Sequence, residues 1–80
     1  MQTKKVDSEI EKLYKKIGRN VANNREKKGL TQIELAQAIG HTSTSIISNG
    51  EIANGKHFNL EHLYKIAKAL EIDICELIKE

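Results

Sequence analysis

Proline is absent from this chain of 80 residues, and aromatic residues make up only 4% of it. Proline interrupts a helix because it lacks an amide hydrogen and clashes with the preceding turn, so its absence permits long helices. Alanine, leucine, glutamate, lysine and glutamine, which favour helices, are frequent instead. A chain of this length and composition is expected to fold as one small all-α domain with a limited core.

Cysteine is represented only by Cys75, so an internal disulfide is excluded. We expect Cys75 to be a small buried apolar residue rather than a redox or catalytic group. The sequence also lacks an apolar run long enough to cross a bilayer and the apolar segment of a signal peptide. These absences predict a soluble, cytoplasmic protein.

The net charge of +2 conceals an uneven distribution along the chain. Residues 1–30 contain nine Lys and Arg and four acidic residues, a balance of +5, whereas residues 31–80 contain four and seven, a balance of −3. A basic first helix is suited to following a phosphate backbone. A solvated helix face explains the same composition equally well, so the charge alone leaves both interpretations open.

The residues that could bind a metal, His41, His57, His62 and Cys75, follow no common zinc spacing. His57 and His62 are five positions apart and would not share one helix face. The sequence also contains no nucleophile elbow and no glycine-rich phosphate loop. We therefore expect no metal site, no cofactor and no enzymatic activity.

The stretch between Gly29 and Gly55 predicts two short helices joined by a tight turn. Thr31 and Glu34 have the spacing of a capping box, which begins a helix by satisfying its first free amides. Gly40 is suited to end that helix, because the residue after a helix commonly takes a left-handed conformation.

The first helix of this pair is expected over residues 32–39. The second is expected to begin near Ser43 and to end near Ile52, with Thr42 or Ser43 as its cap. Two short helices around a glycine turn form the helix-turn-helix arrangement, whose second helix enters the major groove of DNA.

A long helix is predicted before this stretch. Residues 1–7 are expected to form a flexible arm. Ser8 and Glu11 then have the spacing of a capping box, and the helix that they begin continues to about Lys28.

Two more helices are predicted after it. Asn59 is expected to cap a helix over residues 60–70, which carries an apolar stripe. Asp73 and Glu76 form another capping box and predict a last short helix. Phe58 is expected to be buried, either in the core or in a dimer interface.

The order and spacing of these features resemble the signature of the XRE family, the helix-turn-helix domains of phage repressors and Cro proteins. The residues that carry the resemblance are Leu30-Thr31-Gln32, Glu34-Leu35-Ala36, Gly40, Ser48, Glu51, Gly55-Lys56 and the run from Leu60 to Leu70. It extends over about Ile17 to Ile78. It implies an all-α, five-helix, lambda-repressor-like fold, in which residues 8–80 form a single helix-turn-helix domain that binds double-stranded DNA.

The resemblance also implies which residues contact DNA. Small polar side chains on the second helix of the pair are expected to approach base edges: Ser43, Thr44, Ser45, Ser48 and Asn49. Phosphate contacts are expected for Gln32, Thr42, Arg19, Arg25, Asn54 and Lys56. Asparagine can form two hydrogen bonds with adenine, whereas serine and threonine discriminate poorly. Much of the specificity is therefore expected to come from ordered water and DNA shape.

In the resembling family, an arginine four residues before the glycine that ends the first helix pairs with the glutamate that closes the third. Arg25 and Glu51 occupy these positions. A guanidinium can hold a carboxylate through two parallel hydrogen bonds. The pair would fix the first helix against the recognition helix and leave one donor for a phosphate.

Departures from the family pattern affect the third helix. The segment from Gly40 to Glu51 is one residue longer than usual, and that from Glu51 to Gly55 is about two residues longer. Gly50 also stands where an apolar residue is usual, and a glycine inside a helix costs about 1 kcal/mol relative to alanine. Either this glycine lets the helix pack more closely, or the additional residue forms a bulge.

The sequence thus predicts a homodimeric transcriptional regulator, a nucleoid-associated repressor that binds an inverted-repeat operator. No small-molecule ligand is evident, and no binding to a membrane is expected. The alternative is a small helical protein-interaction module, such as an antitoxin that binds a partner protein and has little affinity for DNA. Partner grooves prefer apolar anchors, whereas the predicted recognition helix is polar.

Overall fold

In a computed structural model of the chain, residues 3–79 are described, and they form helices joined by short turns. The helices are α1 (Thr3–Lys27), α2 (Gln32–Ala38), α3 (Ser45–Ile52), α4 (Leu60–Leu70) and α5 (Cys75–Ile78). Five helices and no strand in this range confirm the predicted all-α, five-helix architecture. None of the five combines the length and the apolar character that crossing a membrane requires.

The first helix starts earlier than the sequence predicted. It begins at Thr3, so residues 3–7, which were expected to belong to a flexible arm, are helical. The prediction that Ser8 begins the helix is therefore wrong. No proline or glycine separates Ser8 from the residues before it, and nothing local prevents the helix from continuing through them. Met1 and Gln2, the rest of the predicted arm, lie outside the described residues.

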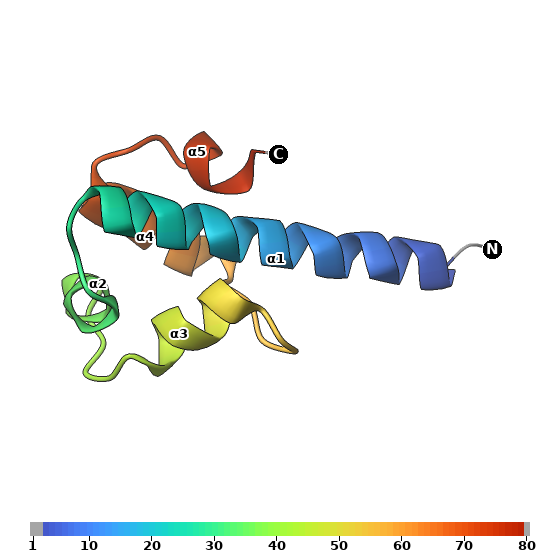
Figure 1. The fold of residues 1–80 in the computed structure, drawn as a ribbon, viewed down its shortest axis with the longest axis horizontal. Coiled ribbons are helices and arrows are strands. Elements are labelled where there is room, and N and C mark those ends of the chain that lie inside the picture. The colour runs from blue at the N-terminus through green and yellow to red at the C-terminus, as the bar shows by residue number, and fades with distance from the viewer. Residues whose placement is uncertain (1–2, 80) are drawn as a thin grey trace.

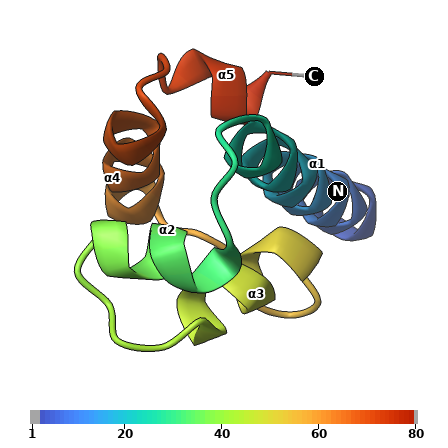
Figure 2. The same cartoon turned by 60° about the vertical axis from the view of Figure 1, so that its left-hand side comes forward.

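α1 is much longer than the other helices, and its first half projects beyond the body of the domain (Figure 1). Residues 4–13 are all exposed, whereas Ile17 and Val21 are buried. The second half of α1 lies against α3 on one side and α5 on another (Figure 2). One helix thus has a packed half and an uncovered half.

α2 begins at the capping box that the sequence predicted. Thr31 Oγ1 accepts a hydrogen bond from the Glu34 amide at 3.2 Å, and Glu34 Oε1 accepts one from the Thr31 amide at 2.8 Å. The hydrogen bond from the Thr31 amide to the ionised carboxylate lowers the pKa of Glu34, and the Thr31 side chain lowers it further. Gly40 follows the helix with a φ of +92°, which confirms the predicted left-handed turn.

α3 begins at Ser45, two residues later than predicted. Its N-cap is Thr44, whose side chain makes no capping hydrogen bond, and Thr42 and Ser43 lie in the preceding turn. The prediction of a cap at Thr42 or Ser43 is therefore wrong. Helices in proteins are stabilised mainly by packing, so a short helix that is well packed elsewhere does not need a side-chain cap.

α4 begins with a capping box in which a histidine takes part. Asn59 Oδ1 accepts from the His62 amide at 2.7 Å, and His62 Nδ1 accepts from the Asn59 amide at 3.3 Å. Asn59 is thus the cap that was predicted, and the role of His62 was not foreseen. Burial lowers the pKa of His62, and the nearby His41 lowers it further, so the ring is favoured in the neutral form that can accept.

α5 is a single turn, and the capping box predicted for it does not form. Asp73 Oδ1 accepts from the amide of Cys75 at 2.8 Å rather than from that of Glu76. Leu77 is buried, whereas Cys75 is exposed, so the prediction of a buried cysteine is wrong. In so short a helix only one side faces the core, and Leu77 occupies it.

The hydrophobic core lies where the five helices meet. Its buried residues are Ile17, Val21, Leu35, Ala36, Ile39, Ile47, Phe58, Leu63, Ile66, Ala67, Leu70 and Leu77. Each helix contributes at least one of them, so no helix is attached to the others by polar contacts alone. α3 contributes one fully buried apolar side chain, Ile47, and Ile46 packs partly against the same core.

Candidate functional site

The C-terminal end of α3 is joined to α1 by an ion pair. Arg25 Nε donates to Glu51 Oε2 at 2.7 Å, and Arg25 Nη2 donates to Glu51 Oε1 at 3.2 Å. Arg25 Nη1 donates to the carbonyl oxygen of Leu30 at 2.8 Å. The structure therefore brings together the two residues for which the sequence analysis expected a two-bond pair.

The ion pair is buried, and this bears on the two roles expected for Arg25, in the pair and at a phosphate. The side chains of Arg25 and Glu51 are 11% and 7% exposed, and the bond to Glu51 raises the pKa of Arg25. All three guanidinium nitrogens contact protein oxygens, so this geometry favours the structural role of Arg25 over the expected phosphate contact. A buried pair of this kind fixes an arrangement more than it adds net stability.

Gln32 joins the same cluster from the start of α2. Its Nε2 donates to Glu51 Oε1 at 2.9 Å, and its side chain is partly buried. Glu51 therefore accepts from α1 and from α2, and the three helices α1, α2 and α3 meet at one carboxylate. This contact holds α2 and α3 at a fixed angle, as a helix-turn-helix unit requires.

The backbones of α1 and α3 approach each other closely beside this cluster, and Gly18 makes that possible. A Cβ atom added at Gly18 would lie 2.3 Å from the carbonyl oxygen of Glu51 and 2.6 Å from that of Gly50. Both are backbone atoms, so the helices would have to move apart. Gly18 was not among the residues expected from the sequence, and an interior glycine in an otherwise strong helix is the signal that indicates it.

The surroundings of Gly50 support the explanation that this glycine lets α3 pack more closely, rather than a bulge. A Cβ atom at this position would lie 2.3 Å from Cζ of Phe58, whose ring is buried. The glycine therefore lets the Phe58 ring pack directly on the backbone of α3. The helix continues without a bulge from Ser45 to Ile52, and Ala53 ends it in a left-handed conformation with φ of 54°.

The residues around the start of α3 are exposed. Ser43 and Thr44 in the turn, and Ser45 in the first turn of the helix, all have exposed side chains. Figure 2 shows this end of α3, joined to α2 by the turn, on the outside of the domain. Hydroxyl groups at such a helix start can donate and accept hydrogen bonds to an approaching ligand.

The other two expected base contacts differ from each other. Ser48 is half-buried, and its hydroxyl donates to the carbonyl oxygen of Ser45 at 3.4 Å. Asn49 is exposed, one residue further along. The side chain of Asn49 is therefore presented to solvent, whereas that of Ser48 is turned partly toward its own helix.

A shallow hollow brings α3 and the following loop together. We call it the α3 hollow, and it is lined by His41, Ser43, Ser45, Ile46, Asn49, Gly50, Gly55, Lys56 and His57. It contains three of the expected base contacts and Lys56, one of the expected phosphate contacts. The exposed Asn54 lies in the same loop, two residues before Lys56.

An aromatic stack fixes the loop that carries Lys56. The rings of Tyr14 and His57 are parallel within 2°, and their centroids are 3.8 Å apart. Because Tyr14 belongs to α1 and His57 to the loop after α3, the stack places this loop against the long helix. The remaining expected phosphate contacts, Arg19 on α1 and Thr42 in the α2–α3 turn, are both exposed.

The sequence analysis considered His41 and His57 only as metal ligands, and the structure gives them other surroundings. His57 stacks on Tyr14, and the ring of His41 lies edge-on to that of His62 with centroids 5.9 Å apart. Within residues 3–79, no three His, Cys, Asp or Glu side chains are grouped so that they could hold a metal ion. Both histidines border the α3 hollow, which their positions beside α3 could have suggested.

Comparison with protein-family models finds a match for the part of the chain that contains this site. The chain matches the family model HTH_3, described as helix-turn-helix, over residues 21–77. The matched region begins within the second half of α1 and ends within α5, so the first half of α1 lies outside it. No curated protein matches the chain.

Proposed function

Because this chain belongs to the XRE family of lambda-repressor-like helix-turn-helix proteins, which are DNA-binding transcription regulators, we propose that it binds a specific double-stranded DNA site and represses transcription there. The single observation that carries the proposal is the α3 hollow. It joins small polar side chains around the start of α3 to the basic loop that follows. Association with the nucleoid would follow from this binding.

Base contacts are assigned to the exposed side of α3. Ser43, Thr44 and Ser45 are free to approach base edges, and Asn49 can form two hydrogen bonds with an adenine. Ser48 is the weakest member of this group, because its hydroxyl already donates within the helix. No arginine stands on α3, so water and DNA shape would supply much of the discrimination.

Phosphate contacts are assigned to residues that surround α3 on both sides. Thr42 precedes the helix, Asn54 and Lys56 follow it, and Arg19 extends the basic surface along α1. Gln32 stands at the start of α2, where the backbone amides of a helix also attract a phosphate. Such contacts set the position of the protein on the duplex without reading its sequence.

We further propose that the protein acts as a homodimer. Two copies of α3 would enter successive major grooves about one helical turn, or roughly 34 Å, apart. The operator would then be an approximate inverted repeat. Repression would follow where such a site overlaps a promoter.

Selection of bound duplexes from a random pool tests the proposal directly. We expect an enriched inverted repeat, and the selected duplex then allows affinity to be measured over a series of salt concentrations. Lys56→Ala should weaken binding to all sequences alike and lower the slope of log affinity against log salt by about 1. Asn49→Ala should instead change the preferred sequence and leave that slope unchanged.

Lys79→Ala is the matched control for Lys56→Ala. Lys79 is exposed and follows α5, which lies on the side of α1 opposite to α3 (Figure 1). Its loss should leave the affinity unchanged. If no duplex is enriched and no duplex is bound even at low salt, the helical interaction module becomes the better interpretation of the fold.

A further inference from the structure

The uncovered first half of α1 carries an apolar stripe. Val6, Ile10 and Leu13 are four and three residues apart, the spacing that places side chains on one face of a helix. They are 49%, 40% and 38% exposed, and Ile17 continues the stripe into the core. Ile10 also borders a hollow that the loop after α3 helps to line. A helix normally buries such a face, whereas Val6, Ile10 and Leu13 stay partly uncovered in the single chain.

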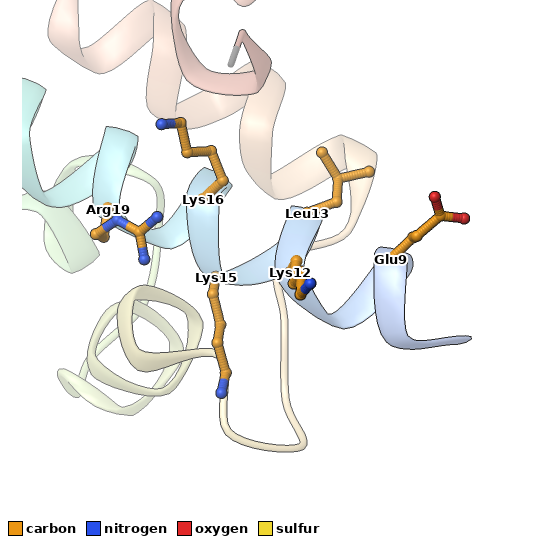
Figure 3. Close-up of a pocket in the computed structure, with 6 residues that line it drawn as sticks. All are labelled: Glu9, Lys12, Leu13, Lys15, Lys16 and Arg19. Carbon is orange, nitrogen blue, oxygen red and sulfur yellow. The ribbon is translucent and has the colours of Figure 1, made fainter. Parts of the chain in front are cut away.

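Leu13 borders a hollow along α1 whose lining is otherwise mostly basic, with Lys12, Lys15, Lys16 and Arg19. It is flanked by Glu9, Lys12 and Lys16, which with Leu13 occupy positions i, i+3, i+4 and i+7 of α1. Figure 3 shows Leu13 and Lys16 on one side of α1 and Lys15 on the opposite side. Glu9 and Lys16 therefore lie beside Leu13 along α1, where they can reach a facing helix.

Charge is segregated along the same helix. After Lys4 and Lys5, the three acidic residues Asp7, Glu9 and Glu11 are followed by the basic residues Lys12, Lys15, Lys16 and Arg19. Two such helices side by side in the same direction would place acid next to acid and base next to base. In opposite directions, the acidic segment of each lies next to the basic segment of the other.

From these features we propose that the Val6–Ile10–Leu13 stripe binds a second copy of this chain, with the two α1 helices packed antiparallel. Leu13 of each copy faces Ile10 of the other, and Glu9 pairs with Lys16 across the interface. Lys12, Lys15 and Arg19 lie outside this seam by helical position and stay free for phosphate. The stripe lies outside residues 21–77, the region that matches the family model.

The inference rests on the proposed homodimer and deepens it, because it says where the dimer forms. It can fail separately from DNA binding, since the mass of the free protein is measured without DNA. Sedimentation equilibrium of the full chain should show a dimer in equilibrium with a monomer. A chain that sediments as a monomer at every concentration but binds duplex overturns the inference and leaves DNA binding intact.

Ile10→Lys tests the position of the interface. The side chain is exposed, so the variant should keep its helical circular dichroism while its dimer dissociation constant rises by more than about tenfold. Leu60→Lys is the matched control, because Leu60 is 74% exposed at the start of α4 and should leave the mass unchanged. Equal dissociation constants for the wild type and Ile10→Lys contradict the assignment.

Charge reversal tests the antiparallel direction. Glu9→Lys and Lys16→Glu should each weaken self-association, because each places like charges opposite one another. The double variant should recover it, and an equimolar mixture of the two single variants should form a heterodimer more readily than either forms a homodimer. Parallel helices do not bring Glu9 opposite Lys16. The antiparallel arrangement is therefore overturned if the double variant does not recover self-association and the mixture does not form the heterodimer.

Discussion

The two ends of α3 are held in different ways. The C-terminal end is fixed by the buried Arg25–Glu51 pair, by Gln32 and by close backbone contact at Gly18. The N-terminal end begins at Thr44 without a side-chain cap, after exposed turn residues. The helix is therefore positioned from one end, and the side chains proposed to contact DNA stand at the other. Substitutions at the two ends should affect stability very differently.

Removal of the ion pair at the C-terminal end of α3 should lower the stability of the fold more than any other change considered. Arg25→Ala leaves Glu51 buried without its main partner, and we expect the free energy of unfolding to fall by roughly 3 kcal/mol, the lower range for an orphaned buried charge. Urea denaturation measures the loss. Arg19→Ala on the same helix is the control, because an exposed arginine should cost less than about 0.5 kcal/mol. A loss that small for Arg25→Ala would refute the structural role of the pair.

Gly18→Ala should be the next most damaging change. Alanine favours a helix by about 1 kcal/mol over glycine, but its Cβ would meet the backbone of α3. We expect a net loss of about 2 kcal/mol from overpacking. Asn23→Ala, at an exposed position of α1, should be neutral or slightly stabilising in the same urea assay. If Gly18→Ala is stabilised as well, α1 and α3 do not approach as closely as described.

The anchored end of α3 was partly predictable from sequence. The pairing of Arg25 with Glu51 came from the resemblance, because residues 26 positions apart reveal no contact by their spacing alone. Gly18 and Gly50 show why packing is harder to predict. Gly18 is explained by the backbone of α3, far along the chain, and Gly50 by the ring of Phe58 in the loop after α3. Neither contact can be read from local sequence patterns.

The exposed end was less predictable for a different reason. Thr42 and Ser43 are good capping residues, and no local signal indicates that the helix starts after them without a side-chain cap. The start of α1 shows the reverse case. Ser8 with Glu11 is a convincing capping box, yet the helix extends to Thr3 because no residue before Ser8 ends it. Local signals predicted which segments are helical better than where each helix begins.

Alanine substitutions at Thr31 and Thr44, the N-caps of α2 and α3, should have smaller and unequal effects on stability. Thr31→Ala removes the hydroxyl that caps α2 and should cost about 1 kcal/mol. Thr44→Ala removes no capping bond and should cost less than about 0.5 kcal/mol. Urea denaturation of the two variants in parallel gives the difference. Equal losses would mean that the start of α3 is capped after all.

The smallest expected effect is a dependence of stability on pH near the exposed end. The neutral Nδ1 of His62 accepts from the Asn59 amide, and its ring lies beside His41 in the turn before α3. The pKa of His62 is lowered in the folded chain, so below the ordinary histidine pKa of about 6.5 the unfolded chain binds more protons. The free energy of unfolding should therefore fall as the pH falls through this range.

We expect this fall to be about 0.5 kcal/mol, the lower range for a lost cap. Urea midpoints measured from about pH 8 to about pH 5 stay above the range in which ordinary carboxylates titrate. His62→Gln keeps an acceptor at the same position of the capping box and cannot be protonated there, so its profile should be flatter. If the pH profile of His62→Gln matches that of the wild type, another group causes the pH dependence. Protonation of His62 then does not destabilise the fold.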